Sequence, residues 1–338
     1  MRGFERERRE FLKLLGMGSG AALLGGFRLP QAFAKDVFPS DRILWIIPIK
    51  PGGGFDTAAR VMSPYLTKYF KEISKEAKAG DVVLKNVPEA GGARAYSNMY
   101  HAKPDGYTIG YFNAAFITES FMSKIETDCT KYTFLVRTHY ATRVICTHKK
   151  SGFKTWEEMM RAGKEKELKW AASNFGRGHH VACILVKEIA KVPARLINFP
   201  GSAENANALI RGDVDMGINT QETAKPLIDA GEFRVLTTLS ETSPYPGVPS
   251  IVQLGYPELA NPLVLHYFVI GPPNLPKEIR DALISVFKKT LNNNEFVVQA
   301  KKIEIYPDAV YGEEADRVAK GFFKFYEEKA PILRKYLM

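Results

Sequence analysis

The segment Pro51-Gly52-Gly53-Gly54-Phe55-Asp56 constrains the fold of this chain more than any other. It follows an apolar run, residues 43–49, and precedes a stretch in which apolar residues recur with helical spacing. The pattern predicts a strand, a glycine turn and the start of a helix. Three glycines let the backbone adopt positive φ and turn N–H groups inward, beside the positive end of the helix dipole. Such a turn predicts a site for a small anion.

The glycine turn does not match the familiar nucleotide-binding motifs. A P-loop needs a lysine shortly after its glycines, and the dinucleotide motif needs a glycine at Thr57. A merely tight strand-to-helix turn is the alternative, but one glycine suffices for that. We expect Asp56 to be the N-cap of the helix, with a second role in orienting water or a ligand donor left open.

The amino terminus has the pattern of an export signal. Arg8-Arg9-Glu10-Phe11-Leu12-Lys13 precedes a weakly apolar stretch, residues 14–27, and the small-x-small sequence Ala32-Phe33-Ala34. The run is too short to span a bilayer, and the paired arginines favour a signal of the twin-arginine (Tat) type. An ordinary basic signal would lead to the same compartment. We therefore predict that residues 1–34 are a signal peptide, cleaved after Ala34, and that the protein is periplasmic.

The net charge favours small anions over nucleic acid. Removing residues 1–34 takes away six basic and three acidic residues, which lowers the formal charge from +10 to +7. The basic residues are interleaved with acidic ones, and no basic stripe carries the stacking aromatics typical of nucleic-acid binders. No other long uncharged apolar run occurs, so we expect a soluble mature protein. A mild positive field helps to gather small anions.

Few residues suggest catalysis or metal binding. Ser173 lacks the Gly-x-Ser-x-Gly context of a hydrolase, although His179 or His180 stands near it in sequence. His179 and Cys183 are four residues apart, but no third metal ligand is apparent. The three cysteines form no metal or redox motif, and the sequence does not decide whether two of them pair.

Short apolar runs alternate with helical patterns from end to end, which favours an α/β fold with mostly parallel sheets. With about 300 mature residues, two domains are expected. Several strand ends carry glycine or short polar residues, and in open α/β sheets such ends converge on one cleft. The apolar runs are residues 43–49, 82–87, 108–112, 134–136, 143–147, 168–172, 195–199, 214–218, 235–239 and 264–270. The polar strand ends are residues 52–54, 89–92, 113–115, 173–178, 200–202 and 219–220.

From Ile43 to the carboxyl terminus the chain resembles the substrate-binding proteins of tripartite tricarboxylate transporters, the Bug family of periplasmic solute receptors. The order and spacing of several motifs carry this resemblance. They are the segment 51–56 with Ala59-Arg60, Asn86-Val87-Pro88 with 90–92, Lys103-Pro104-Asp105-Gly106-Tyr107-Thr108, Ala172-Ser173 with Gly176 and Gly178, His180-Val181-Ala182, Gly212-Asp213-Val214-Asp215 and Tyr245-Pro246-Gly247-Val248-Pro249-Ser250.

The resemblance implies a two-lobed periplasmic binding protein, or Venus flytrap, with a hinge and a central cleft. Lobe 1 would be residues 35–136 plus 262–338, and lobe 2 residues 137–261. Main-chain N–H groups and waters from one turn in each lobe would grip a carboxylate of the solute. By motif these turns supply Gly53, Gly54, Asp56, Ser173, Gly176 and Gly178, and other loops supply Asn113, Pro200, Gly201, Ser202 and Asn219.

The chain departs from the family pattern at three places. Phe55 and Phe175 replace small polar residues, and Arg177 lies inside the second turn. We hypothesise that Phe55, Phe175, Phe112 and Phe199 surround an apolar or aromatic carboxylate, with Arg177 available to a second charge. The alternative is that these phenylalanines pack inside the lobes.

We therefore expect an extracytoplasmic receptor, not an enzyme, that captures a small organic carboxylate and delivers it to the membrane permease subunits of the transporter. The resemblance implies no cofactor, and we expect a monomer with no metal and no nucleic-acid partner. Two alternatives stay open. One is a periplasmic hydrolase that uses Ser173 with His179 or His180, and the other is a ligand-sensing module for a membrane kinase.

Overall fold

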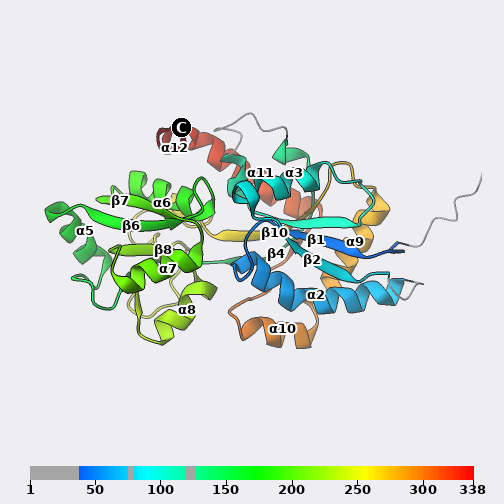
Figure 1. Ribbon diagram of the computed structural model, residues 1–338, viewed down its shortest axis with the longest axis horizontal. Coiled ribbons are helices and arrows are strands. Elements are labelled where there is room, and N and C mark those ends of the chain that lie inside the picture. Colours follow the sequence, from blue (N-terminus) through cyan, green and yellow to red (C-terminus); the bar gives the residue numbers. More distant parts are fainter. Residues whose placement is uncertain (1–37, 75–78, 119–126) are drawn as a thin grey trace, which may run out of the picture. The chain divides into compact units, whose positions relative to one another are not determined.

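The computed structural model describes residues 38–74, 79–118 and 127–338. The predicted signal peptide, residues 1–34, and its cleavage site after Ala34 lie outside the described residues, so both stay predictions. The part from Phe38 onward forms one unit built on two β-sheets with helices on both faces of each (Figure 1). We call the first sheet with its helices lobe 1 and the second lobe 2.

The sheet of lobe 1 has six strands in the described chain, in the order β11-β4-β10-β3-β1-β2. Strand β1 pairs in parallel with β2 and β3, whereas β10 runs antiparallel to β3 and β4, and β11 antiparallel to β4. Four of the five residues of β1 are buried, as is typical of a strand covered on both faces. The strands are β1 Ile43–Ile47, β2 Val82–Asn86, β3 Thr108–Phe112, β4 Thr133–Ala141, β10 Leu265–Gly271 and β11 Val310–Tyr311.

The sheet of lobe 2 has five strands in the described chain, in the order β7-β6-β8-β5-β9. Strand β6 pairs in parallel with β7 and β8, and β5 runs antiparallel to β8 and β9. The strands are β5 Arg143–His148, β6 Leu168–Ser173, β7 Ala194–Phe199, β8 Met216–Thr220 and β9 Phe233–Thr238.

Side chains on opposite faces of each sheet belong to separate hydrophobic clusters, because successive strand residues point to opposite sides. In lobe 1, Trp45 packs with α2 and α9, and Ile46 packs in the cluster that contains α3 and α11. In lobe 2, α5 and α6 cover one face, and α7 and α8 cover the other. The helices are α2 Gly54–Ile73, α3 Ala93–Tyr100, α5 Trp156–Glu165, α6 Gly178–Ile189, α7 Ser202–Arg211, α8 Gln221–Asp229, α9 Lys277–Leu291, α10 Asn294–Lys301, α11 Glu313–Glu328 and α12 Ala330–Leu337. Short 3₁₀ turns are η1 Glu89–Gly92, η2 Ala114–Thr118, η3 Cys129–Lys131 and η4 Pro257–Leu259.

Helix α2 shows how the sequence pattern becomes packing. Its buried stripe includes Met62, Leu66 and Phe70, spaced by four residues along one helix face. Full burial of side chains of this size stabilises the fold by about 1.5–3 kcal/mol each. The stripe therefore fixes the start of α2 against the sheet, next to the glycine turn.

The expected two-lobed α/β architecture is confirmed, but the sheets are mixed rather than mostly parallel. Four of the nine strand pairings among the described residues are parallel. The antiparallel pairs involve the strands that carry the chain between the sheets: β4 continues into β5 after Thr142, and β10 brings it back. These strands follow no helical crossover, which parallel pairing of consecutive strands requires.

Two further contacts join the lobes away from these strands. Helix α12, which follows α11 of lobe 1, packs on α6 of lobe 2, and the Tyr336 hydroxyl donates to Glu188 Oε1 at 2.5 Å. The hydroxyl of Thr118 in lobe 1 donates to the carbonyl of Gly176 in lobe 2 at 3.1 Å. The exact lobe boundaries, near residues 136 and 262, stay a prediction. No described helix is both long and apolar enough to cross a bilayer.

Candidate functional site

A cavity of about 710 Å³ lies between the two lobes, at the carboxyl ends of their parallel strands. The turns after β1, β3, β6 and β7 line it, as does the end of β8. In open α/β sheets the carboxyl ends of parallel strands are where ligands bind. The lining residues that carry the argument below are Gly54, Asn113, Arg143, Phe175, Arg177, Gly178, Phe199, Ser202, Glu204 and Thr220.

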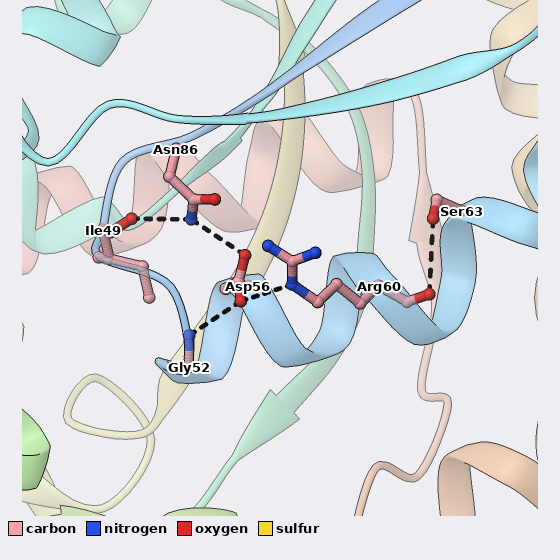
Figure 2. Close-up of polar contacts among 6 residues, drawn as sticks. All are labelled: Ile49, Gly52, Asp56, Arg60, Ser63 and Asn86. Carbon is pink, nitrogen blue, oxygen red and sulfur yellow. Dashed lines mark hydrogen bonds and ion pairs between the residues drawn. The ribbon is translucent and has the colours of Figure 1, made fainter.

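The structure corrects the role of Asp56. Gly53 is the N-cap of α2, so Asp56 is the third helical residue rather than the cap. From this position its carboxylate reaches back over the first turn and accepts the Gly52 N–H at 2.9 Å (Figure 2). It also accepts Arg60 Nε at 2.8 Å and Asn86 Nδ2 at 3.0 Å. Asp56 therefore holds the glycine turn, and it does not line the cavity.

The carboxyl group of Asp56 is charged in the fold. It is 2% exposed, and burial alone would raise its pKa, but the hydrogen bonds from Arg60, Gly52 and Asn86 together lower that pKa below its ordinary value. Asn86 extends the network, because its Nδ2 also donates to the carbonyl of Ile49 at 3.0 Å (Figure 2). The end of β2 is thereby tied to the turn that follows β1.

The three glycines of the turn have separate roles. Gly52 has φ of +83°, where an L side chain is strained, and a Cβ on Gly54 would overlap the Tyr267 hydroxyl. The Gly52 N–H is taken by Asp56, and the Gly53 N–H faces the Lys50 carbonyl at 3.4 Å. Within the described chain, the N–H groups of Gly54, Phe55 and Asp56 meet no acceptor, as at any helix start. The amides open to a ligand are therefore those of Gly54 and Phe55, which line the cavity.

A second helix start faces the cavity from lobe 2. Arg177 is the N-cap of α6, and Gly178 is its first residue. A Cβ on Gly178 would lie 2.7 Å from Asn113 Nδ2 and 2.7 Å from an Arg143 Nη, so only glycine allows both to approach. Asn113 Oδ1 accepts the Ala115 N–H at 2.9 Å, which leaves its Nδ2 as the free end. Donors from three elements thus meet at one point.

Helix α7 provides the third helix start at the cavity. Gly201 is its N-cap and Ser202 its first residue, and both line the cavity with Pro200. The first turn of α7 also carries Glu204, which lies 3.9 Å from Lys50 Nζ. A helix start carries a partial positive charge, and anions bind there.

The charged side chains that line the cavity are mostly basic. Lys50, Arg143 and Arg177 line it, against one acid, Glu204. A second cavity, of about 880 Å³, has the opposite balance, because five acids and two cations from the described chain line it. The acids are Glu222, Asp229, Glu241, Asp308 and Glu304, and the cations are Arg137 and Lys225. The cavity between the strand ends is therefore the one suited to an anion.

The guanidinium of Arg177 is not available to a ligand charge in the way the sequence suggested. Its Nε donates to the Gly91 carbonyl at 2.6 Å and its Nη2 to the Ala90 carbonyl at 2.7 Å. It also lies 5.1 Å from the centroid of the Phe116 ring. Arg177 therefore ties the α6 start of lobe 2 to the η1 turn of lobe 1 while lining the cavity.

The four phenylalanines divide into two groups. Phe175, 56% exposed, and Phe199 line the cavity. Phe55 lines it as a residue, but its ring is stacked on Tyr111, with centroids 5.0 Å apart. Phe112 is fully buried and does not line the cavity, so its proposed contact with the solute is wrong. A strand-end phenylalanine points into the cavity or into the core according to its face, which the sequence left undecided.

The remaining predicted residues lie behind the cavity wall. Gly176 is buried, and its N–H donates to His180 Nδ1 at 2.9 Å. Ser173 and Asn219 are fully buried, and none of the three lines the cavity. Thr220, which follows Asn219, does line it, and sequence reasoning missed this residue. Sequence reasoning also missed Arg143, which stands at the start of an apolar run and was taken only as part of a strand.

Ser173 and His179 contact each other, but the pair is poorly suited to nucleophilic catalysis. Ser173 Oγ lies 2.8 Å from His179 Nδ1, yet Ser173 is fully buried and outside the cavity lining. Burial, aided by the charge of Arg143, lowers the pKa of His179 to about 3, whereas a general base works best near the ambient pH. No described carboxylate bonds to His179 to complete a triad.

Metal and thiol chemistry find little support in the described chain. It contains no group of three His, Cys, Asp or Glu side chains able to hold a metal ion. Cys129, Cys146 and Cys183 are free and buried. Burial raises the pKa of the Cys183 thiol well above its ordinary value, which leaves it an inert part of the core.

Comparison with known proteins gives the family. Residues 68–323 match the model of the tripartite tricarboxylate transporter family receptor, TctC. A protein from the tcbD-tcbE intergenic region of Pseudomonas sp. strain P51, named UPF0065, is 25% identical over 294 residues, 85% of this chain and 84% of the relative. MatC from Rhodopseudomonas palustris with bound malate has a TM-score of 0.74 at 18% identity, over 87% of this chain and 100% of that one.

The R. palustris protein Rpa4515 with adipate has a TM-score of 0.75 at 20% identity, over 87% of this chain and 98% of that one. At these identities the two solved structures support the fold alone. The family model covers most of the chain, from the middle of α2 to the middle of α11. The chain therefore belongs to the receptor family of the tripartite tricarboxylate transporters.

Proposed function

We propose that this protein is a periplasmic receptor that captures a small organic carboxylate between its lobes and delivers it to the permease subunits of a tripartite tricarboxylate-type transporter. One observation carries the proposal: the starts of α2, α6 and α7 all line one cavity. Their N–H groups are donors that the helices leave unused. A carboxylate offers only acceptors, so it complements such a site.

The carboxylate would sit between Gly54 and Phe55 of lobe 1 and Gly178 and Ser202 of lobe 2. Hydrogen bonds to a charged group are worth about 1.5–3 kcal/mol each, so a few of them supply much of a micromolar affinity. Closing the lobes would exclude water and strengthen each bond. Binding and release, with no bond made or broken, need none of the catalytic groups that an enzyme requires.

The body of the solute would be apolar or aromatic. Phe175 and Phe199 line the cavity together with Ile49 and Leu265, which gives apolar surface beside the donors. Malate and adipate are the acids bound to the two family structures named above, so we place the solute among small organic acids of this kind. Phe175, exposed at the cavity wall, would cover the solute as the lobes close.

Delivery would depend on the closed form. A solute that bonds both lobes binds the closed state more tightly and shifts the population toward it. The strands that pass between the sheets, β4 to β5 and β9 to β10, would act as the hinge. A permease that recognises only the closed form would then receive loaded receptors.

A thermal-shift panel tests the proposal on the mature protein. The panel contains mono-, di- and tricarboxylates, aromatic acids and the primary amide of each acid. At a hundredfold excess over Kd, binding adds about 2.7 kcal/mol, which is a shift of roughly 5 °C or more for a protein of this size. We expect at least one acid to shift the melting temperature while its amide does not. A panel in which no acid shifts it, or in which amides work as well, would contradict the proposal.

A cavity-filling variant provides the control. Gly178→Val places a side chain against Asn113 Nδ2 and Arg143, inside the cavity. The variant should lose the acid-induced shift. Its ligand-free melting temperature reports separately on the fold. Retention of the full shift would place the solute elsewhere.

A further inference from the structure

We propose that Arg143 forms an ion pair with the bound carboxylate, so that this receptor selects its solute by full negative charge as well as by hydrogen bonding. The inference rests on the proposed function and names a residue that recognises the solute in that same cavity. Arg143 is the first residue of β5, where the chain enters lobe 2. It is 1% exposed and lines the cavity.

The guanidinium of Arg143 is only partly satisfied by the protein. Its Nη1 donates to the carbonyl of Leu263, and its buried Nε has no hydrogen-bond partner in the described chain. No hydrogen bond of its Nη2 to a described residue is found either. Nε and Nη2 form one edge of the guanidinium, the pair of donors that a carboxylate accepts side by side. The edge left open is therefore the one that fits the proposed solute.

The charge of Arg143 also lacks a partner. No described Asp or Glu lies within ion-pair distance of it. Glu204, the acid that lines the same cavity, is paired with Lys50. Glu222 lines the other cavity, and burial raises its pKa to about 7, so at neutral pH it supplies less than a full negative charge. An arginine keeps its proton even when buried, so the positive charge persists.

The groups around the open edge are donors as well. Asn113 Nδ2 and an Nη of Arg143 each lie 2.7 Å from the point where Gly178 would carry a Cβ. The Gly178 N–H at the start of α6 has no acceptor within the described chain. A buried cation surrounded by donors destabilises the empty protein, and an entering anion relieves this cost. Arg143 therefore links ligand-free stability to solute charge in a way that a structural arginine would not.

The test uses calorimetric titration of the mature protein with an acid from the panel and with its amide. Wild type should bind the acid far more tightly than the amide. Arg143→Met should weaken acid binding by about 30-fold or more, as when one partner of a buried charge pair is truncated. Amide binding should change little. Ligand-free Arg143→Met should melt at or above the wild-type temperature, because an unpaired buried charge is gone.

A matched control and a second variant sharpen the result. Lys50→Met removes another cation that lines the cavity, but Lys50 is exposed and already paired with Glu204, so affinity should change by less than about threefold. Asn113→Asp places a carboxylate beside Arg143. It should raise the ligand-free melting temperature and weaken acid binding more than amide binding. This variant decides the matter where Arg143→Met fails to fold.

The outcomes separate the two proposals. If wild type binds no acid of the panel, the proposed function fails. If wild type binds an acid and folded Arg143→Met binds it equally well, only the role of Arg143 is overturned. Where Arg143→Met does not fold, unchanged acid affinity in Asn113→Asp overturns it instead. A loss of affinity in Arg143→Met with equal losses for acid and amide also contradicts the ion pair, since it would mark Arg143 as a structural residue.

Discussion

Asp56 should be worth more to the stability of this fold than an ordinary helix acid. It is 2% exposed, and it accepts hydrogen bonds from Gly52, Asn86 and Arg60 (Figure 2). Bonds to a charged acceptor contribute about 1.5–3 kcal/mol each. The bond from Arg60 should contribute at most about 1 kcal/mol, because that side chain is 55% exposed. Water reaches exposed Gly52 and offsets part of its loss.

We therefore expect Asp56→Ala to lower the free energy of unfolding by about 2–4 kcal/mol. Urea unfolding of the ligand-free mature protein measures this, with unchanged m-values as the sign that the unfolding reaction is the same. Arg60→Ala removes only the exposed donor and should cost less than about 1 kcal/mol. The difference between the two variants isolates the bonds to Gly52 and Asn86.

The same experiment tests the link to binding. Because Asp56 holds the turn that precedes Gly54, its loss should weaken acid binding as well as stability. If Asp56→Ala costs no more than Arg60→Ala, the carboxylate does not hold the turn. If stability falls but solute affinity is unchanged, the turn does not position the amides at the start of α2.

Three further predictions follow from contacts around the cavity. Arg177→Ala removes the bonds to the Ala90 and Gly91 carbonyls and should weaken solute affinity by about tenfold, with a larger radius of gyration in X-ray scattering; unchanged values would mean that the bridge does not hold the lobes. The pKa of Asp56 is lowered in the fold, so its stabilisation is complete above the unfolded pKa of about 3.9 and is lost as pH falls through the folded value. Asp56→Asn should therefore flatten the acid limb of stability against pH, and an identical limb would refute the charge network. Ser173→Ala should leave solute binding within about threefold, because Ser173 is buried behind the cavity wall, and a turnover of esters abolished by this change would restore the hydrolase alternative.

Much of the fold was readable in the sequence because its signals are local. The apolar run before the glycines became β1, and the helical spacing after them became α2. The strand ends predicted to converge do line one cavity at several places. Strand direction was not readable, since the apolar pattern of a strand is the same for either direction. The antiparallel strands β4, β5 and β10 therefore emerged only with the structure.

The site was less predictable because it depends on distant contacts. Asp56 was taken as the N-cap, but the sequence does not distinguish a cap from an acid in the first turn that reaches back to the loop. Arg143 stands at the start of an apolar run, and only the tertiary fold shows that its guanidinium is buried at a cavity. Arg177 lies in a predicted ligand turn, yet carbonyls 86 and 87 residues away engage it.

The most direct test is a crystal structure of the mature protein with the acid that binds most tightly in the panel. We predict a carboxylate oxygen within about 2.7–3.1 Å of the backbone nitrogen of Gly54 or Phe55, in the cavity of about 710 Å³ between the lobes. A solute seated in the acidic cavity beside Glu222 would contradict the account. So would a solute in the predicted cavity whose carboxylate faces away from the start of α2.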